Sequence, residues 1–144
     1  MKLAVVYASK SGNTEELAKL LLRLFLEQEA DVSLYRVEDF PSKRLTSFDA
    51  VMIGTYTWGS GEIPLEMMGL FQAFERQDAR NVMTGVFGTG DSGYPHFCGA
   101  VDLFRDMLYR KSRLAVTMKV ELRPQAKDLK KCQRFVNILL KAMV

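Results

Sequence analysis

The sequence has little cysteine, histidine or tryptophan. Its 144 residues include two cysteines, one histidine and one tryptophan. Cys98 and Cys132 form no CxxC pair, and with His96 they do not have the spacing of a metal site. Two lone thiols fit a reducing compartment better than a disulfide framework. We therefore expect a cytoplasmic protein without a metal centre.

Long apolar runs are also missing. No segment approaches the roughly 18 consecutive apolar residues that a membrane-spanning helix needs. The start, MKLAVVYASK, has the lysine and short apolar run of a signal peptide, but the run stops at Ala8 and Lys10 follows. This pattern is more typical of a buried strand than of a signal peptide. We expect no membrane association.

Internal repeats, low-complexity tracts and linkers are absent as well. A chain of 144 residues fits a single domain, 1–144. A chain of this length buries about two thirds of its unfolded surface, so its core needs no disulfide or metal. Hydrophobic residues make up 48% of the chain, which is ordinary for a globular protein.

The net charge of +3 is unevenly distributed. Residues 1–72 carry 7 Lys/Arg and 10 Asp/Glu, whereas residues 73–144 carry 13 and 7. A basic half is compatible with a nucleic acid or an acidic partner, and equally with a solvated helix face. The basic half is the only feature of the sequence that would support a nucleic-acid role. We therefore favour the solvated helix face and expect no nucleic-acid partner.

Short apolar segments alternate with helical patterns along the chain. Asn13 is a good N-cap for the first helix, and Leu129 and Cys132 of the last helix are expected to face inward. The alternation predicts an α/β fold with a parallel sheet covered by helices on both faces. The expected strands are 2–8, 30–37, 49–55, 81–88 and 113–122. The first expected helix begins at Thr14, and the other three are 63–76, 97–111 and 126–143.

Ligands of parallel sheets bind beyond the carboxyl ends of the strands, where the strand order reverses. The first, third and fourth expected strands are followed there by SKSGNT (9–14), TYTWGSGEIP (55–64) and GTGDSGYPHF (88–97). The first loop opens onto a helix, whose free N–H groups and dipole favour an anion such as a phosphate. It is neither a Walker P-loop nor GxGxxG, and an ordinary strand–helix turn is the alternative.

The other two loops each bring one aromatic side chain, Trp58 and Tyr94. Gly59 and Gly61 remove bulk beside Trp58, and the glycines of the third loop let its backbone approach a ligand closely. On the expected sheet, both rings lie at one edge above the first loop and form a slot for a flat ring. The three loops together predict a site for a mononucleotide with a large planar base. The alternative is two unrelated surface aromatics.

The three loops resemble those of the flavodoxin family, and the likeness covers essentially the whole chain. SKSGNT resembles the phosphate loop, commonly [ST]-x-[ST]-G-x-T. TYTWGSGEIP resembles the loop whose T-W-G supplies one stacking ring, and GTGDSGYPHFCGAVD the loop whose G-D-x-x-Y supplies the other. There is no room for the long insertion in the fifth strand of some members, so the chain resembles the short-chain type. The resemblance implies a flavodoxin-like three-layer sandwich, with a five-stranded parallel sheet in the order 2-1-3-4-5.

The resemblance also implies one noncovalent FMN, no catalytic residue, and a monomer that shuttles single electrons. The partners it implies are a donor of the flavodoxin/ferredoxin-NADP reductase type and redox acceptor proteins. Trp58 and Tyr94 would flank the isoalloxazine, Phe97 and Cys98 would close the site, and His96 could touch the cofactor. By motif, the phosphate would be bound by Ser9, Lys10, Ser11, Gly12, Asn13 and Thr14. The ring edges and ribityl chain would be met by Thr55, Tyr56, Thr57, Trp58, Gly59, Ser60, Gly61, Thr89, Gly90 and Asp91.

The chain departs from the family in its charge. Flavodoxins are typically acidic, whereas the acids near these loops are only Glu62 and Asp91, set against Lys10. We expect the cations of the last helix to lie away from the flavin edge.

Other functions on this fold stay open. One is activation of a manganese ribonucleotide reductase, which a basic surface would suit. Another is an NAD(P)H-dependent flavin, quinone or azo reductase, although the longer loops and the nicotinamide site of such enzymes are missing. The intact loops argue against a binding module that has lost its flavin.

Overall fold

Five parallel strands form one sheet in a computed structural model that describes residues 1–144. Their order is β2-β1-β3-β4-β5, which confirms the fold class and the strand order that the sequence predicts. The central strands are buried on both faces, which explains why their sequences are apolar almost throughout. The strands are β1 (Lys2–Tyr7), β2 (Asp31–Arg36), β3 (Ala50–Thr55), β4 (Met83–Gly90) and β5 (Arg113–Glu121).

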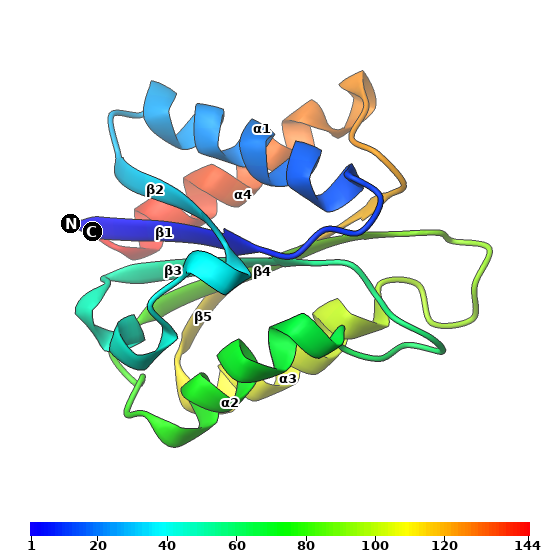
Figure 1. Cartoon of the computed structure of the whole chain (residues 1–144). Coiled ribbons are helices and arrows are strands. Elements are labelled where there is room, and N and C mark those ends of the chain that lie inside the picture. Colours follow the sequence, from blue (N-terminus) through cyan, green and yellow to red (C-terminus); the bar gives the residue numbers. More distant parts are fainter.

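Helices cover both faces of the sheet (Figure 1). One layer holds α1 (Asn13–Glu27) and α4 (Leu129–Ala142), and the other holds α2 (Met68–Arg76) and α3 (Gly99–Lys111). Short 3₁₀ turns complete the chain. They are η1 (Val37–Asp39), η2 (Ser42–Ser47), η3 (Leu65–Met67) and η4 (Ala126–Asp128).

The core consists of two apolar clusters, one on each face of the sheet. Ile53 of β3 packs with Phe104 in the cluster under α2 and α3. Met52, the preceding residue of β3, packs with Phe25 and Phe135 in the cluster under α1 and α4. Because successive strand residues point to opposite faces, this double burial fixes the register of the sheet. It thereby sets where the carboxyl ends of the strands and the loops after them lie.

The predicted N-cap of α1 is wrong. Gly12, not Asn13, is the N-cap, and it adopts φ +96° without a side-chain capping bond. Ser9, which lies before the helix, takes the role of the capping side chain. Its Oγ accepts the N–H groups of Gly12 at 3.1 Å and of Glu15 at 3.2 Å. Sequence spacing favoured Asn13 because a left-handed Gly12 cannot be read from composition.

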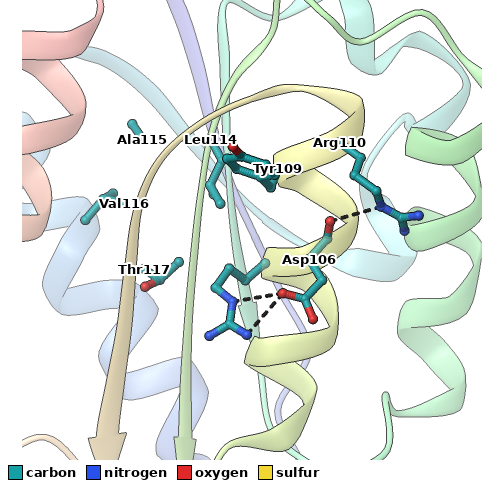
Figure 2. Close-up of a pocket in the computed structure, with 8 residues that line it drawn as sticks. Asp106, Tyr109, Arg110, Leu114, Ala115, Val116 and Thr117 are labelled. Carbon is teal, nitrogen blue, oxygen red and sulfur yellow. Dashed lines mark hydrogen bonds and ion pairs between the residues drawn. The ribbon is translucent and has the colours of Figure 1, made fainter.

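A bulge in β5 changes which face its side chains meet. Thr84 pairs with Leu114, but the next residue, Gly85, pairs with Val116. Leu114 therefore packs with the cluster under α2 and α3, while Val116 packs with the opposite cluster. Figure 2 shows Leu114 beside Tyr109 and Val116 pointing away from it.

The first turns of α4 carry exposed cations at an electrostatically unfavourable place. Lys127 and Lys131, and likewise Lys130 and Arg134, stand four residues apart, and none of the four pairs with a carboxylate. The first turn of α4 contains no acidic residue, and the one carboxylate at its start is that of Asp128, the N-cap. Like charges at this spacing repel, and cations oppose the positive end of the helix dipole. The apolar face of α4 must therefore stabilise the helix.

Leu129, at the start of α4, is 38% exposed, so the expectation that it faces inward is wrong. Cys132 is fully buried, as expected. Leu129 lies instead beside a surface hollow between α1 and α4.

We expect Lys130→Glu to stabilise the protein. A carboxylate there would meet the positive end of the helix dipole and attract Arg134, which together contribute about 0.5–1 kcal/mol. Urea unfolding followed by circular dichroism measures the change. The matched control is Lys141→Glu in the last turn of α4, where a carboxylate opposes the dipole and gives no gain. A larger gain for Lys141→Glu than for Lys130→Glu would contradict this assignment.

Candidate functional site

A cavity of about 940 Å³ lies where β1, β3 and β4 end. Its volume is within the range of about 300–1,000 Å³ that small-molecule pockets occupy. The loops that form it extend at the end of the sheet opposite the two termini (Figure 1). The lining residues are Lys10, Ser11, Asn13, Tyr56, Thr57, Trp58, Gly59, Ser60, Gly61, Thr89, Gly90, Asp91, Tyr94, Pro95, His96, Cys98 and Leu122.

Five residues singled out from the sequence do not line the cavity: Ser9, Gly12, Thr14, Thr55 and Phe97. Thr14 lies beneath it, where its hydroxyl is 2.7 Å from that of buried Thr89 and joins α1 to β4. Ser9 organises the first loop, as described above. The Thr55 hydroxyl donates to the Tyr56 carbonyl at 2.7 Å, and Phe97 packs against the cluster under α2 and α3.

Two lining residues were not singled out from the sequence, Pro95 and Leu122. Pro95 lies within the quoted stretch GYPHF and could have been found there. Leu122 belongs to no loop motif. It reaches the cavity because its N–H donates to the Gly90 carbonyl at 2.7 Å just after β5 ends, with φ +55°. Only the pairing of β5 with β4 reveals it.

The first loop presents free backbone donors. Ser9 satisfies the N–H groups of Gly12 and Glu15, but those of Ser11, Asn13 and Thr14 have no acceptor in the protein. They stand at the N-terminus of α1, whose dipole favours a negative charge. This donor set fits a phosphate group.

The acidic side chain nearest these donors is turned away from them. Glu15 accepts the hydroxyl of Tyr7 at 2.6 Å and lies 3.4 Å from Arg36. The bond from Tyr7 lowers the pKa of Glu15, and burial together with the same bond raises the pKa of Tyr7 to about 12. Glu15 therefore stays a paired carboxylate at neutral pH and leaves the loop free for an anion.

The second loop is a tight hairpin held against the third. Trp58 and Glu62 exchange backbone hydrogen bonds of 2.8 Å, and Gly61 between them has φ +113°. A Cβ on Gly61 would come within 2.9 Å of the His96 Cβ, and one on Gly99 within 2.8 Å of the Gly61 Cα. This close approach requires glycine at both positions.

Two exposed aromatic side chains stand at the cavity. Trp58 is 49% exposed and Tyr94 is 68% exposed, so both rings are open to contact with a ligand. The Lys10 Nζ lies 4.2 Å from the centroid of the Trp58 ring. Because Lys10 and Trp58 line the same cavity, a flat ligand that stacks on this face must displace the ammonium group.

Cys98 is buried in the cavity wall and is not a nucleophile. It is 1% exposed, and burial raises the pKa of its thiol to about 11. The thiol is therefore protonated at neutral pH. No group of three or more His, Cys, Asp or Glu side chains is arranged to hold a metal ion. None of the helices has the length and apolar character that crossing a membrane requires.

A second hollow, of about 680 Å³, lies between α3 and the edge strand β5 (Figure 2). Two of its charged side chains form an ion pair, and a third bonds to the backbone. Arg105 pairs with Asp106 at 3.0 Å, and the Arg110 Nε donates to the Asp106 carbonyl at 3.2 Å. This hollow offers none of the free donors of the cavity.

Comparison with known proteins gives consistent matches. The family model described as flavodoxin matches residues 5–135. The chain is 39% identical over 139 residues to probable flavodoxin 1 of Bacillus subtilis, covering 94% of this chain and 88% of the relative. It is 34% identical over 133 residues to a flavodoxin of Maridesulfovibrio salexigens, covering 89% and 91%. The crystal structure of oxidised flavodoxin 2 from Bacillus cereus matches with a TM-score of 0.92 and 33% identity over 99% of both chains. Nothing in these comparisons favours the ribonucleotide reductase activator or the NAD(P)H-dependent reductase.

Gly61→Ala should destabilise the protein by about 1–3 kcal/mol, because a Cβ would strain the positive φ and press on His96. The control is Gly69→Ala, since no atom lies within 4 Å of a Cβ there and alanine in α2 gains about 0.5–1 kcal/mol. Urea unfolding measures both variants. Equal effects would show that the contact between the second and third loops is not tight.

The two thiols should be inert in the folded protein. Burial raises the pKa of both Cys98 and Cys132 to about 11, above the value of 9.0 for a free thiol. Their contribution to stability is therefore complete below about pH 9 and is lost as the pH rises towards 11. At pH 8, a disulfide reagent such as DTNB should modify neither thiol until urea unfolds the chain. Rapid modification of folded protein would contradict this placement.

Proposed function

The chain belongs to the flavodoxin family, whose members bind FMN and transfer electrons, and we propose that its cavity holds FMN across the three loops. The observation that carries this binding mode is the meeting of free phosphate donors and two exposed aromatic rings in one cavity of about 940 Å³. Bound FMN supplies one-electron redox chemistry. The protein binds it, orients it and limits its contact with water.

At one end of the proposed mode, the first loop binds the phosphate. The free N–H groups of Ser11, Asn13 and Thr14 donate to its oxygens, and Ser9 keeps the loop in the shape that presents them. Lys10 leaves the face of Trp58 when the ring stacks there. Its ammonium group then adds a positive charge to a loop that already favours anions.

At the other end, Trp58 and Tyr94 flank the isoalloxazine. Stacking between aromatic faces adds to the burial of apolar surface. The backbone from Thr55 to Gly61 and from Thr89 to Asp91 meets the ring edges and the ribityl chain, and Cys98 closes the cavity from below. Gly59 has φ +55° and no Cβ, so the Gly59–Ser60 peptide can change its orientation cheaply.

We further propose that residues 1–144 work as one monomeric carrier domain rather than as an enzyme. The cavity contains no activated nucleophile, because its one thiol is protonated, and its one carboxylate, Asp91, accepts the N–H of Gly93. A carrier needs only an accessible ring edge, which the exposed Trp58 and Tyr94 provide for a reductase-type donor and for acceptor proteins.

Trp58→Ala tests the ring site. Loss of one stacking surface should weaken FMN binding by 10- to 100-fold, because such contacts contribute about 1–3 kcal/mol. Titration of the FMN-free protein, followed through the quenching of FMN fluorescence, measures the dissociation constant. Tyr109→Ala is the control, since this tyrosine on α3 is 78% exposed and lies outside the cavity. Equal affinities for the two variants would rule out the ring site.

A further inference from the structure

Exposed cations gather on α1, η4 and the start of α4, outside the cavity. We call this cluster the α1–α4 basic surface and define it by Arg23 of α1, Lys127 of η4, and Lys130, Lys131 and Arg134 of α4. All five side chains are exposed, and none forms an ion pair. Lys131 donates to the backbone carbonyl of Lys119 at 2.6 Å, which leaves its charge uncompensated.

The segment that leads to the basic surface begins at the cavity. Leu122 lines the cavity, and the next residue, Arg123, pairs with Glu16 of α1 at 3.1 Å. The connection from β5 to α4 and the start of α1 lie at the loop end of the molecule (Figure 1). None of the cations of the last helix lines the cavity, and the expectation that they lie away from the flavin edge stays a prediction.

This arrangement opposes the stability of α4. Lys127, Lys130, Lys131 and Arg134 repel one another at helical spacing, near the positive end of the helix dipole. Glu16 is engaged with Arg123, and the carboxylate of Asp128, the N-cap of α4, offsets only the dipole part of this cost. Cations at repelling spacing without an ion pair break a local rule, which is typical of functional surfaces.

A small apolar floor accompanies the charge. Leu20, Ala126 and Leu129 form it in a hollow of about 460 Å³ between α1 and the start of α4, whose other lining residues are Glu16, Lys19, Arg23, Pro124 and Gln125. Leu129 is 38% exposed although it begins the helix. Charge around a small apolar area is the composition of a transient protein interface.

We propose that the α1–α4 basic surface docks an acidic electron-transfer protein beside the FMN cavity. The inference rests on the proposed function, because docking here matters only if the cavity next to it holds a redox group. Leu122 lines the cavity, and the segment that follows it leads through η4 to Leu129, so a partner seated here contacts the connection that leaves the cavity.

Charge and composition select this partner over two others. A second copy of the chain would bring like charges together. A single-stranded nucleic acid would need aromatic rings for base stacking, and the basic surface has none. An acidic protein satisfies both the cations and the apolar floor.

The test measures electron transfer to two haem proteins of opposite charge. The FMN-loaded protein, reduced by dithionite and freed of excess reductant, is mixed with the acidic soluble domain of cytochrome b5 or with basic cytochrome c. One electron leaves the flavoprotein and reduces one ferric haem iron to ferrous. At low ionic strength, the second-order rate constant should be larger for the acidic protein and should fall as salt is added.

Charge reversal then locates the surface. Lys130→Glu with Arg134→Glu should lower the rate constant for the acidic cytochrome about 10-fold, raise that for cytochrome c, and weaken the acidic protein's binding in calorimetric titration. Lys127→Glu with Lys131→Glu should do the same. The matched control reverses Lys43 and Arg44 on η2, which are exposed and form no ion pair, and should change either rate by less than about twofold.

Three results would overturn the proposal. The first is faster reaction with cytochrome c, and the second is equal effects of the α4 and η2 reversals. The third is salt-sensitive binding of a 20-nucleotide single-stranded DNA that is lost in the α4 variants while the acidic cytochrome is unaffected, which would assign the surface to nucleic acid. Loading is measured first through the quenching of FMN fluorescence. A wild-type chain that binds no FMN overturns the proposed function and this inference together, whereas a loaded chain without charge discrimination overturns the inference alone.

Discussion

The burial of β1, β3 and β4 on both faces is the constraint on which the rest of the structure depends. Parallel strands covered by two helical layers must be apolar on both sides, and they must end at the same edge. That edge gathers loops that are far apart in the sequence, so that Trp58 and Tyr94 line one cavity with the start of α1. The loops stay in place because glycine lets the second and third approach closely, at Gly61 and Gly99.

Electrostatics divides the loop end of the molecule into two regions. Inside the cavity, charges are few and balanced. Lys10 lies over Trp58, and Asp91 accepts the N–H of Gly93 at 2.8 Å, while Glu15, which does not line the cavity, bonds to Tyr7. Outside it, the α1–α4 basic surface carries unpaired cations that cost helix stability. The neutral interior suits a bound phosphate ester with a planar ring, and the charged exterior suits a partner of opposite sign.

Sequence reasoning reached the fold and the family because both depend on strong local patterns. Apolar segments predict buried strands, and the three loop motifs follow the strands that meet at one edge. The mispredicted features are those that depend on tertiary contacts. Asn13 was mistaken for the N-cap because the left-handed turn at Gly12 lets Ser9 bond back. Leu129 was expected inward, although Cys132 is the first buried residue of α4. Leu122 carries no motif and reaches the cavity only through the pairing of β5 with β4.

Titration of FMN and of riboflavin into the FMN-free protein tests the central claim most directly, since the two ligands differ only in the phosphate. We predict one FMN bound per chain, with its fluorescence quenched, and at least about tenfold weaker binding of riboflavin, because charge-assisted bonds to the first loop contribute about 1.5–3 kcal/mol. Equal affinity for both ligands, or no quenching, would contradict the account that the free N–H groups at the start of α1 and the ring of Trp58 form one site.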